Sequence, residues 1–509
     1  MSKRIAATVL ALSCAYSLHA ADEERHSHPA PDKLGSVSFP TSCAPAVQVV
    51  FERGLALLHS FAYSASEQAF RNVAGQDPNC AIAYWGMAMT HYHQLWEAPA
   101  GNELHAGAEL IGKAIDTRSG SPRERRFIEA LRTYYRDPEH ATPAVRAERY
   151  ARAMAGVARD NAGDMESQIF YALALLAIAP PSDKTHANQK QAVAILEPLY
   201  RSHPQHPGLA HYLIHASDSA EMASQGLAAA RAYSQIAPSA PHALHMPSHI
   251  FTRLGLWDDS IASNRAARAA AHEQGDIGEE LHAMDYLTYA YLQRGREAEA
   301  QQIVVELRSM TSITASQFKA GYAATAMPVR FAVERRAWDS AASLEPLSQS
   351  PPHVAALAYW ARALGRARSE HPRSSDADIG RLDECRRELQ AAGNSYWATQ
   401  VDVLFKEAQA WRSAAKGESE AAIQGLRAAA GEEDAIEKLP VTPGPIVPAR
   451  EQLGELLLDL KRPQEALQEF RTALSSAPRR RGALVGAIAA AERLGNTQVV
   501  TQLRADLNR

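Results

Sequence analysis

Small and apolar residues recur along the chain with helical spacing, and a proline follows them. Residues three and four positions apart lie on one face of a helix, so each run predicts a helix with one apolar face. The clearest runs are Ser66, Phe70, Val73 and Pro78; Ala192, Leu196, Leu199 and Pro204; Gly226, Ala230, Tyr233 and Pro238; and Ala466, Phe470, Ala473 and Pro478. Proline ends such a helix because it has no amide hydrogen to donate. The second and third runs lie 34 residues apart, which indicates a repeated unit.

The pattern resembles the tetratricopeptide repeat, a pair of helices with a period of about 34 residues. The resemblance covers most of residues 45–509. It implies an all-α fold: a tetratricopeptide-like solenoid of about ten helical hairpins wound into a right-handed superhelix. The chain also resembles long exported bacterial proteins of this repeat type that carry a HALHMPSHIF-like segment, here residues 242–251. In such proteins, positions 2, 5, 9, 12 and 13 of each first helix line a concave groove that binds ligands.

Breaks in the repeat predict the domain boundaries. A first repeat block covers residues 45–160, and a central solenoid rich in histidine covers 161–437. The tract 438–448 contains four prolines and predicts a rigid loop. A last pair of repeats then covers 449–509. The proline-rich loop is either a spacer between repeats or a segment that folds over the groove.

The N-terminus has the layout of a secretory signal. Lys3 and Arg4 precede an apolar run, and small residues lead to a cleavage point near Ala20 or Ala21. We therefore expect a signal peptide at residues 1–21 and a periplasmic or secreted protein. A lipid anchor is the less favoured alternative, because Leu12 stands where a lipoprotein signal needs a small residue. Residues 22–44 are rich in Pro, Ser and His and are expected to form a disordered linker.

Composition excludes several classes of protein. The 509 residues carry a formal net charge of -4, so no basic surface is predicted to bind nucleic acid. Beyond the signal no apolar run reaches the ~20 residues of a membrane helix. In an oxidising compartment Cys43 and Cys80 can pair, because they flank the first predicted repeat; two unpaired, buried thiols are an equally good interpretation. The oligomeric state is not indicated by the sequence.

Histidines concentrate in one part of the central solenoid. Eight of the chain's 20 histidines lie within residues 206–293. If each closing proline marks position 32 of its repeat, His211 and His215 occupy positions 5 and 9 of one first helix. His245 and His249 occupy the same positions in the next repeat. Residues four apart share a helix face, so all four imidazoles are predicted to face the groove.

These imidazoles predict a transition-metal site. Neighbouring packed helices lie about 8–10 Å apart, so side chains from two first helices can converge on one ion. Imidazole ligands suit zinc, copper or iron. Asp285 occupies position 5 of the third repeat and is predicted as a further ligand, as a residue that orients an imidazole, or as a general base. His282, at position 2 of that repeat, is the other catalytic candidate.

Two interpretations without a metal stand beside this one. The histidines can serve a polar or catalytic groove, or they can be structural residues inherited by repeat duplication. Duplication is disfavoured, because other repeats carry Phe51 and Leu55, or Trp85 and Met89, at the same positions.

Other residues are predicted to line the same groove. His242, Tyr289, Arg330, Glu451 and Glu455 occupy groove positions of their repeats. An ordinary ion pair, with Glu334 as a candidate partner, is the simpler role for Arg330. His59 and His93 fall at position 13 of their repeats and are most simply interpreted as surface residues.

The residues leave two functions open. The chain is either a groove-forming scaffold of the cell envelope that binds a peptide, a protein segment or a small molecule, or a protein that holds a transition metal at the histidines. Hydrolase and nucleotide-binding signatures such as HExxH, GxSxG and the P-loop are missing from the sequence. Enzymatic activity is therefore uncertain and, if present, is predicted to be metal-dependent and of a hydrolase or oxygenase type.

Overall fold

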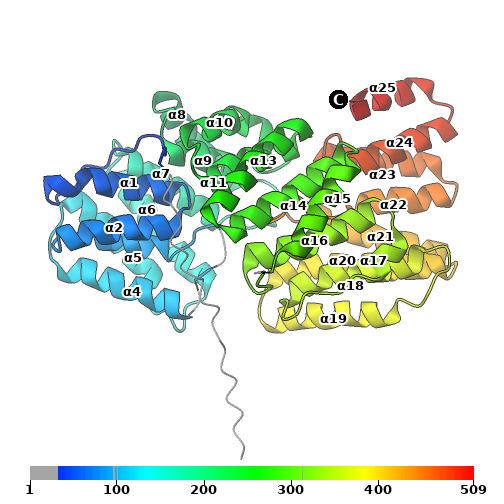
Figure 1. The fold of residues 1–509 in the computed structure, drawn as a ribbon, viewed down its shortest axis with the longest axis horizontal. Coiled ribbons are helices and arrows are strands. Elements are labelled where there is room, and N and C mark those ends of the chain that lie inside the picture. The colour runs from blue at the N-terminus through cyan, green and yellow to red at the C-terminus, as the bar shows by residue number, and fades with distance from the viewer. Residues whose placement is uncertain (1–31, 96–97, 100, 312, 509) are drawn as a thin grey trace, which may run out of the picture.

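The computed structural model describes residues 32–95, 98–99, 101–311 and 313–508. Within these ranges the chain forms helices and turns, with no β-strand, so the predicted all-α class is confirmed (Figure 1). The predicted signal peptide at residues 1–21 lies outside the described residues, as do residues 22–31 of the predicted linker.

The first half of the chain carries the helices that lead up to and include the histidine region. They are η1 (Pro45–Val47), α1 (Gln48–His59), α2 (Tyr63–Gln76), α3 (Ala81–Thr90), α4 (Gly101–Asp116), α5 (Pro122–Tyr135), α6 (Pro143–Asp160), α7 (Met165–Ala177), α8 (Ala187–Ser202), α9 (Pro207–Ala216), α10 (Ala223–Ile236), α11 (Pro241–His245) and α12 (Pro247–Arg253).

The second half continues the series to the C-terminus. It consists of α13 (Trp257–Gln274), α14 (Ile277–Gln293), α15 (Glu297–Ser309), α16 (Phe318–Glu334), α17 (Trp338–Ala342), α18 (Pro352–Arg368), α19 (Asp376–Ala391), α20 (Ser395–Ala415), α21 (Ser419–Asp434), α22 (Ala449–Asp459), α23 (Pro463–Ser476), α24 (Arg481–Arg493) and α25 (Thr497–Asn508).

Consecutive helices pack as antiparallel pairs because small residues let them approach closely. The Phe70 ring on α2 lies against Gly54 on α1 and Gly86 on α3, where an added Cβ atom would come within 3.0 Å and 2.7 Å of it. Phe470 on α23 occupies the same place between Gly454 and Gly486. The repeat pattern therefore has the packing role expected of it, and the chain is a tetratricopeptide-like helical solenoid.

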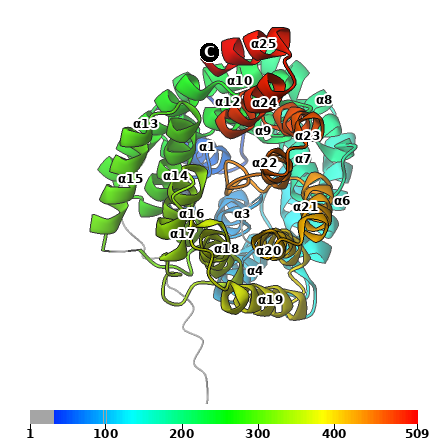
Figure 2. The same cartoon turned by 90° about the vertical axis from the view of Figure 1, so that its right-hand side faces the viewer.

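The solenoid curls until distant helices meet (Figure 2). At one contact α9 approaches the end of α1, and a Cβ atom at position 208 would lie 2.6 Å from Nδ1 of His59, so only glycine fits at Gly208. At another, the indole N–H of Trp257 donates to the carbonyl oxygen of Arg479, at 3.1 Å. Residues on the inner face of the solenoid are buried as a result.

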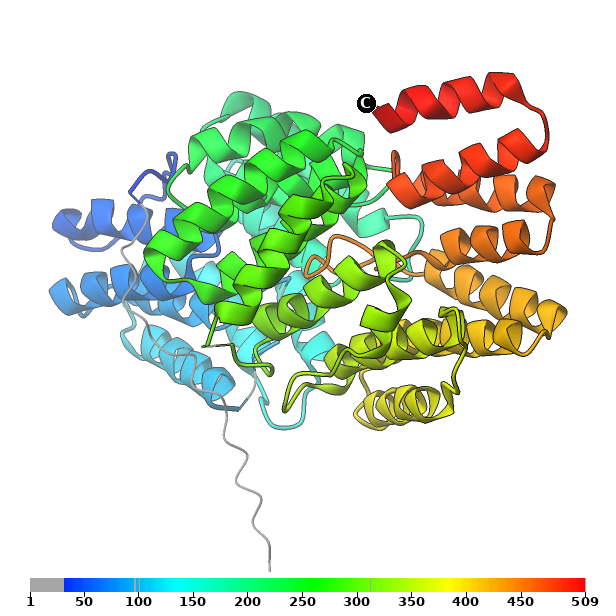
Figure 3. The same ribbon diagram turned by 45° about the vertical axis from the view of Figure 1, so that its right-hand side comes forward.

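The proline-rich loop 438–448 runs into the interior of the solenoid (Figures 2 and 3). Its carbonyl oxygens meet side chains of the inner face: Arg330 Nη1 donates to Pro445 O at 3.2 Å, and Arg480 Nη2 donates to Ile446 O at 3.1 Å. Thr442 and Ile446 are buried. The loop thus fills space between repeats that are far apart in sequence.

Residues 32–44, the described part of the predicted linker, lie against the first helices. Phe39 is fully buried, with its ring 5.2 Å from that of Phe51 and 5.5 Å from that of Phe127. Cys43 and Cys80 form a disulfide, which settles the pairing that the sequence left open and is consistent with an oxidising compartment. Cys385 is a buried free thiol.

Replacement of both Cys43 and Cys80 by serine is expected to lower the free energy of unfolding by about 2–4 kcal/mol. The disulfide joins residues 37 apart in sequence and so restricts the unfolded chain. Thermal unfolding with and without a reductant measures the effect. Reductant should lower the Tm of the wild type to that of the variant and leave the variant unchanged; equal Tm values for oxidised and reduced wild type would contradict the expectation.

Among the described residues, no helix combines the length and the apolar character that crossing a bilayer requires.

Candidate metal centre

Four helices bring six histidines to the inner face of the solenoid. His211 and His215 come from α9, which begins with Pro207 at its first position. His242 and His245 come from α11, His249 from α12 and His282 from α14. Pro247 separates α11 from α12, because proline has no amide hydrogen to donate within a helix.

His211, His215 and His242 form a first cluster, which we call triad 1. The Nε2 atom of His211 lies 3.1 Å from Nε2 of His215 and 3.2 Å from Nε2 of His242. One ring nitrogen from each residue lies within 4.8 Å of the other two. His211 and His242 are buried, and His215 is partly buried.

His245, His249 and His282 form a second cluster, triad 2. The Nε2 atoms of His245 and His249 are 3.0 Å apart, and the ring of His282 lies 4.3 Å from that of His245. All three side chains are buried. The ring of Tyr286 covers the triad, with its centroid 4.7, 5.1 and 5.3 Å from those of the three imidazoles.

Hydrogen bonds fix the tautomers of the central imidazoles in triad 2. Nδ1 of His245 lies 2.6 Å from Oδ1 of Asn264, whose own NH₂ group donates to Ser260 O, so the histidine must donate. Nδ1 of His249 donates to the carboxylate of Asp218 at 2.9 Å. In a neutral imidazole only one nitrogen carries hydrogen, so both Nε2 atoms hold lone pairs.

Triad 1 is oriented in the same way. Nδ1 of His211 donates to the carbonyl oxygen of His59 at 2.6 Å, which leaves a lone pair on its Nε2. Nδ1 of His242 faces the carboxylate of Glu279 at 3.4 Å. In each triad, therefore, two imidazoles direct Nδ1 at an acceptor while their Nε2 atoms face inward. Metal-binding histidines in proteins are held in this way.

Burial favours the neutral form of His211, His245 and His249. Burial, followed by the nearby His215 and His242, lowers the pKa of His211 well below its ordinary 6.5. Burial, followed by His282 and His249, lowers the pKa of His245 well below 6.5. Burial also lowers the pKa of His249 to about 4, although its hydrogen bond to Asp218 acts in the opposite direction. Neutral rings retain the lone pair that a metal ion needs.

The two triads are neighbours. The ring centroids of His215 and His249 are 6.2 Å apart, and those of His242 and His245 are 6.3 Å apart. The side chains of triads 1 and 2 therefore lie in one buried region of the solenoid.

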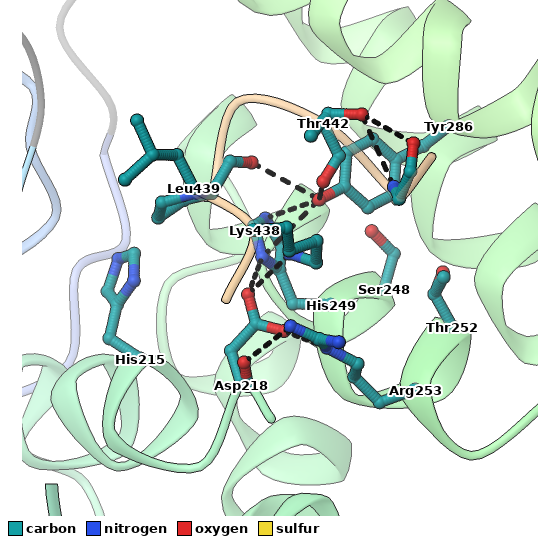
Figure 4. Close-up of polar contacts among 12 residues, drawn as sticks. His215, Asp218, Ser248, His249, Thr252, Arg253, Tyr286, Lys438, Leu439 and Thr442 are labelled. Carbon is teal, nitrogen blue, oxygen red and sulfur yellow. Dashed lines mark hydrogen bonds and ion pairs between the residues drawn. The ribbon is translucent and has the colours of Figure 1, made fainter. Parts of the chain in front are cut away.

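Asp218 joins this region to the proline-rich loop (Figure 4). One carboxylate oxygen accepts from His249 and, at 2.8 Å, from Nζ of Lys438; the other accepts from Nε of Arg253 at 2.9 Å. Burial alone would raise the pKa of Asp218, but Lys438, Arg253 and His249 together hold it well below its ordinary value. Asp218 is therefore an anion that orients His249 and anchors the start of the loop.

Tyr286 makes a second link to the loop. Its hydroxyl lies 3.2 Å from the carbonyl oxygen of Pro440 and 3.1 Å from that of Thr442. Tyr286 and Lys438 therefore hold the loop beside His249 of triad 2 (Figure 4).

The structure separates the predicted site residues into two groups. His242 and His282, expected as a groove residue and a catalytic candidate, lie in the triads with the four histidines that were predicted as ligands. Asp285 instead lies 3.4 Å from Nε of Arg330, and both side chains are completely buried. Burial raises the pKa of Asp285, and Arg330 partly offsets this rise.

The remaining groove candidates form an ion-pair network beyond the triads. Glu451 accepts from Nε of Arg480 at 2.6 Å, and the Tyr289 hydroxyl lies 3.2 Å from Nη1 of Arg480. Glu455 accepts from Arg368 at 2.8 Å. Glu334, the expected partner of Arg330, pairs with Arg480 at 2.9 Å. These charged groups are thus occupied with one another.

A third buried cluster contains residues that lie far apart in the sequence. Glu166 accepts from His59 at 3.0 Å and from His206 at 2.9 Å, and the Tyr212 hydroxyl lies 3.0 Å from Nδ1 of His59. The expectation that His59 lies on the surface is wrong: it is completely buried, because α9 packs against the end of α1. Its fixed position presents its carbonyl oxygen to His211.

Several of the supporting residues gave only weak signals in the sequence. Asp218 follows His215 by three positions and could have been noticed for that reason. Asn264 and Lys438 have no such link to the histidines, since the contacts arise only when helices and loop pack together.

Comparisons with known proteins add a likeness of fold. No protein-family model matches the chain, and no curated protein matches it. Among solved structures, the chain is similar to a monomeric mutant of IFIT1 with Gppp-AAAA, at 11% identity and a TM-score of 0.36, over 84% of this chain and 90% of that one. It is also similar to the P58(IPK) TPR domain, at 13% identity and a TM-score of 0.20, over 89% and 99% of the two chains. Ypp1 gives 10% identity and a TM-score of 0.46 over 91% and 81%. These values are too low to transfer any function.

Proposed function

We propose that this chain is a transition-metal-binding protein whose tetratricopeptide-like solenoid holds metal at triads 1 and 2. One observation carries the proposal. The Nε2 atoms of His245 and His249 face each other at 3.0 Å, and both rings already donate from Nδ1. Two lone pairs that face each other in a buried site repel, whereas a cation between them is attracted by both.

A proton is a poor occupant of this position. It would place a positive charge on a ring that has lost its contact with water, at a cost of several kcal/mol for an incompletely paired ion. Zinc, copper or iron would instead accept the lone pairs at about 2.0–2.1 Å, the bond length of zinc–imidazole sites. The separations of 3.0–3.2 Å between Nε2 atoms suit two ligands on one such ion.

An open groove for peptides has less support. Tyr289, Arg330 and Glu451, which were predicted to line it, are 4%, 0% and 1% exposed. Arg330 donates to the carbonyl oxygen of Pro445 in the proline-rich loop, and Glu451 and the Tyr289 hydroxyl both contact Arg480. A metal-binding interior accounts for the burial, whereas a peptide groove requires these residues to be accessible.

We further propose that the protein functions outside the cytoplasm. The signal-like N-terminus supports export, and the disulfide between Cys43 and Cys80 is stable in an oxidising compartment.

Metal content tests the proposal. The mature protein, purified without a polyhistidine tag, is expected to carry at least one transition-metal ion per chain by elemental mass spectrometry. Replacement of all six triad histidines by glutamine, which keeps a polar side chain of similar reach, should remove this metal while helical circular dichroism persists. Exposed histidines give a matched control, since His105 and His140 are 56% and 80% exposed and their replacement should change nothing.

Wild-type protein that is folded and still binds no metal after exposure to zinc, copper and iron would contradict the proposal. So would metal retained in full by the six-glutamine variant.

A further inference from the structure

We propose that the six histidines hold a pair of copper ions, one on each triad; this inference rests on the proposed function and specifies its metal. The pair would be a single buried dinuclear centre at the junction of α9, α11, α12 and α14.

The repeat itself builds the same ligand unit twice. Triad 1 consists of His211 and His215, four apart on one first helix, and His242 at the start of the next. Triad 2 consists of His245 and His249, again four apart, and His282 near the start of the following first helix. Two ligands of the second unit, His245 and His249, lie 34 residues after His211 and His215, and the third, His282, lies 40 residues after His242. Equivalent ligand sets at equivalent positions predict equivalent ions.

Each triad also has its own close contact between lone pairs. In triad 1 it lies between Nε2 of His211 and Nε2 of His242, at 3.2 Å, and in triad 2 between Nε2 of His245 and Nε2 of His249, at 3.0 Å. One tetrahedral ion takes four ligands and would leave some of the six imidazoles unused. Two ions, with three imidazoles each, use all of them and leave each ion a position for a small ligand.

The two positions are close enough for the ions to interact. Neighbouring packed helices lie about 8–10 Å apart. Side chains that project from such helices toward each other can come closer than the helices themselves. The ring centroids of His215 and His249 are 6.2 Å apart, and those of His242 and His245 are 6.3 Å apart. Ions held by the two triads would therefore be neighbours in one buried region of the solenoid.

The charges around the triads favour copper. All six ligands are imidazoles, and the nearest carboxylates, Asp218 and Glu279, face the outer nitrogens of His249 and His242. Those carboxylates are already paired, Asp218 with Lys438 and Arg253 and Glu279 with Lys319. Two divalent ions would therefore repel each other with no anionic ligand between them. Copper can enter as Cu(I), which halves the charge of each ion, and Cu(II) binds imidazole most tightly among the divalent ions of its row.

Iron and manganese fit less well, because protein sites for these ions include carboxylate ligands. Zinc has the right affinity for imidazole but is always divalent.

The experiment counts copper ions in wild type and in two matched variants. Tag-free protein is loaded with Cu(I) under anaerobic conditions, freed of excess copper and analysed for copper per chain. Wild type should hold two. The variant with His211→Gln and His242→Gln should hold one, on triad 2, and the variant with His245→Gln and His249→Gln should also hold one, on triad 1. Circular dichroism shows whether each variant is folded.

Electron paramagnetic resonance after oxidation distinguishes a pair from two remote ions. In wild type the two Cu(II) ions should broaden or cancel each other's signal, so that the signal accounts for less copper than elemental analysis finds. Each double variant should give the full signal of one isolated Cu(II).

The outcomes separate this inference from the proposed function. One copper per chain in wild type, or two copper ions with the full signal of isolated centres, would overturn the pair while metal binding stands. Two tightly held zinc ions in protein that rejects copper would overturn the choice of metal. Protein that binds no metal under any loading condition would remove both proposals.

Discussion

Replacement of Asp218 by alanine is expected to weaken metal binding by about 10- to 100-fold and to lower the free energy of unfolding by about 3–5 kcal/mol. The first effect follows because the Asp218 carboxylate accepts from Nδ1 of His249 and so aims Nε2 into triad 2. Loss of such an orienting residue typically costs this factor in metal affinity.

The second effect has an electrostatic cause. Lys438 and Arg253 both donate to Asp218 and are only 7% and 13% exposed. Removal of the carboxylate leaves two nearly buried cations next to each other, and breaking a buried ion pair on one side costs about 3–5 kcal/mol. Lys438, the first residue of loop 438–448, should therefore lose its attachment to the segment that follows α9.

Competition with a metal chelator measures the affinity, and urea unfolding followed by circular dichroism measures the stability. Asp339→Ala is the control: Asp339 is 89% exposed and its pairing with Arg373 at the surface should contribute little. If the Asp218→Ala protein has the metal affinity and urea midpoint of this control, the carboxylate neither supports metal binding nor stabilises the fold.

Replacement of Arg480 by methionine is expected to lower the free energy of unfolding by about 3–5 kcal/mol. Arg480 is completely buried and donates to Glu451 at 2.6 Å and to Glu334 at 2.9 Å. It also donates to the carbonyl oxygen of Ile446 in the proline-rich loop. Methionine fills the space but leaves two buried carboxylates without their cation.

Urea unfolding tests this expectation against two further variants. Arg462→Met removes a partly exposed arginine that pairs with Glu465 and Glu420 and should cost no more than about 1 kcal/mol. Glu451→Gln added to Arg480→Met should restore part of the lost stability, because one of the stranded charges disappears. If Arg480→Met unfolds at the urea concentration of Arg462→Met, the buried ion pairs do not stabilise the fold.

The sequence was sufficient to predict the helical architecture. Small and apolar residues at intervals of three and four specify which face of each helix is buried, and this is a property of neighbouring residues in the chain. The Phe70 and Phe470 rings lie between paired glycines as the repeat requires. Pro247 likewise interrupts its helix because of its own covalent structure.

The sequence also placed four histidines on one stripe of the solenoid, but it did not determine their partners. His242 and His282 complete the triads because successive repeats bring the start of one first helix next to the middle of the preceding one. Metal binding by these residues stays a prediction. Asp285 occupies the same repeat position as His211 and His245, yet it contacts Arg330, since the third repeat faces α16 rather than another histidine helix.

Local spacing along the chain thus determined the helices, their pairing and the helix face that carries the imidazoles. Only the tertiary structure decided how the imidazoles are grouped and which nitrogen of each ring faces inward. Those features depend on the carbonyl oxygen of His59, the amide of Asn264 and the carboxylate of Asp218. The distances along the chain from these residues to their histidine partners range from 19 to 152 residues. They come together because the solenoid curls and its loop turns inward, which no periodicity of three or four residues encodes.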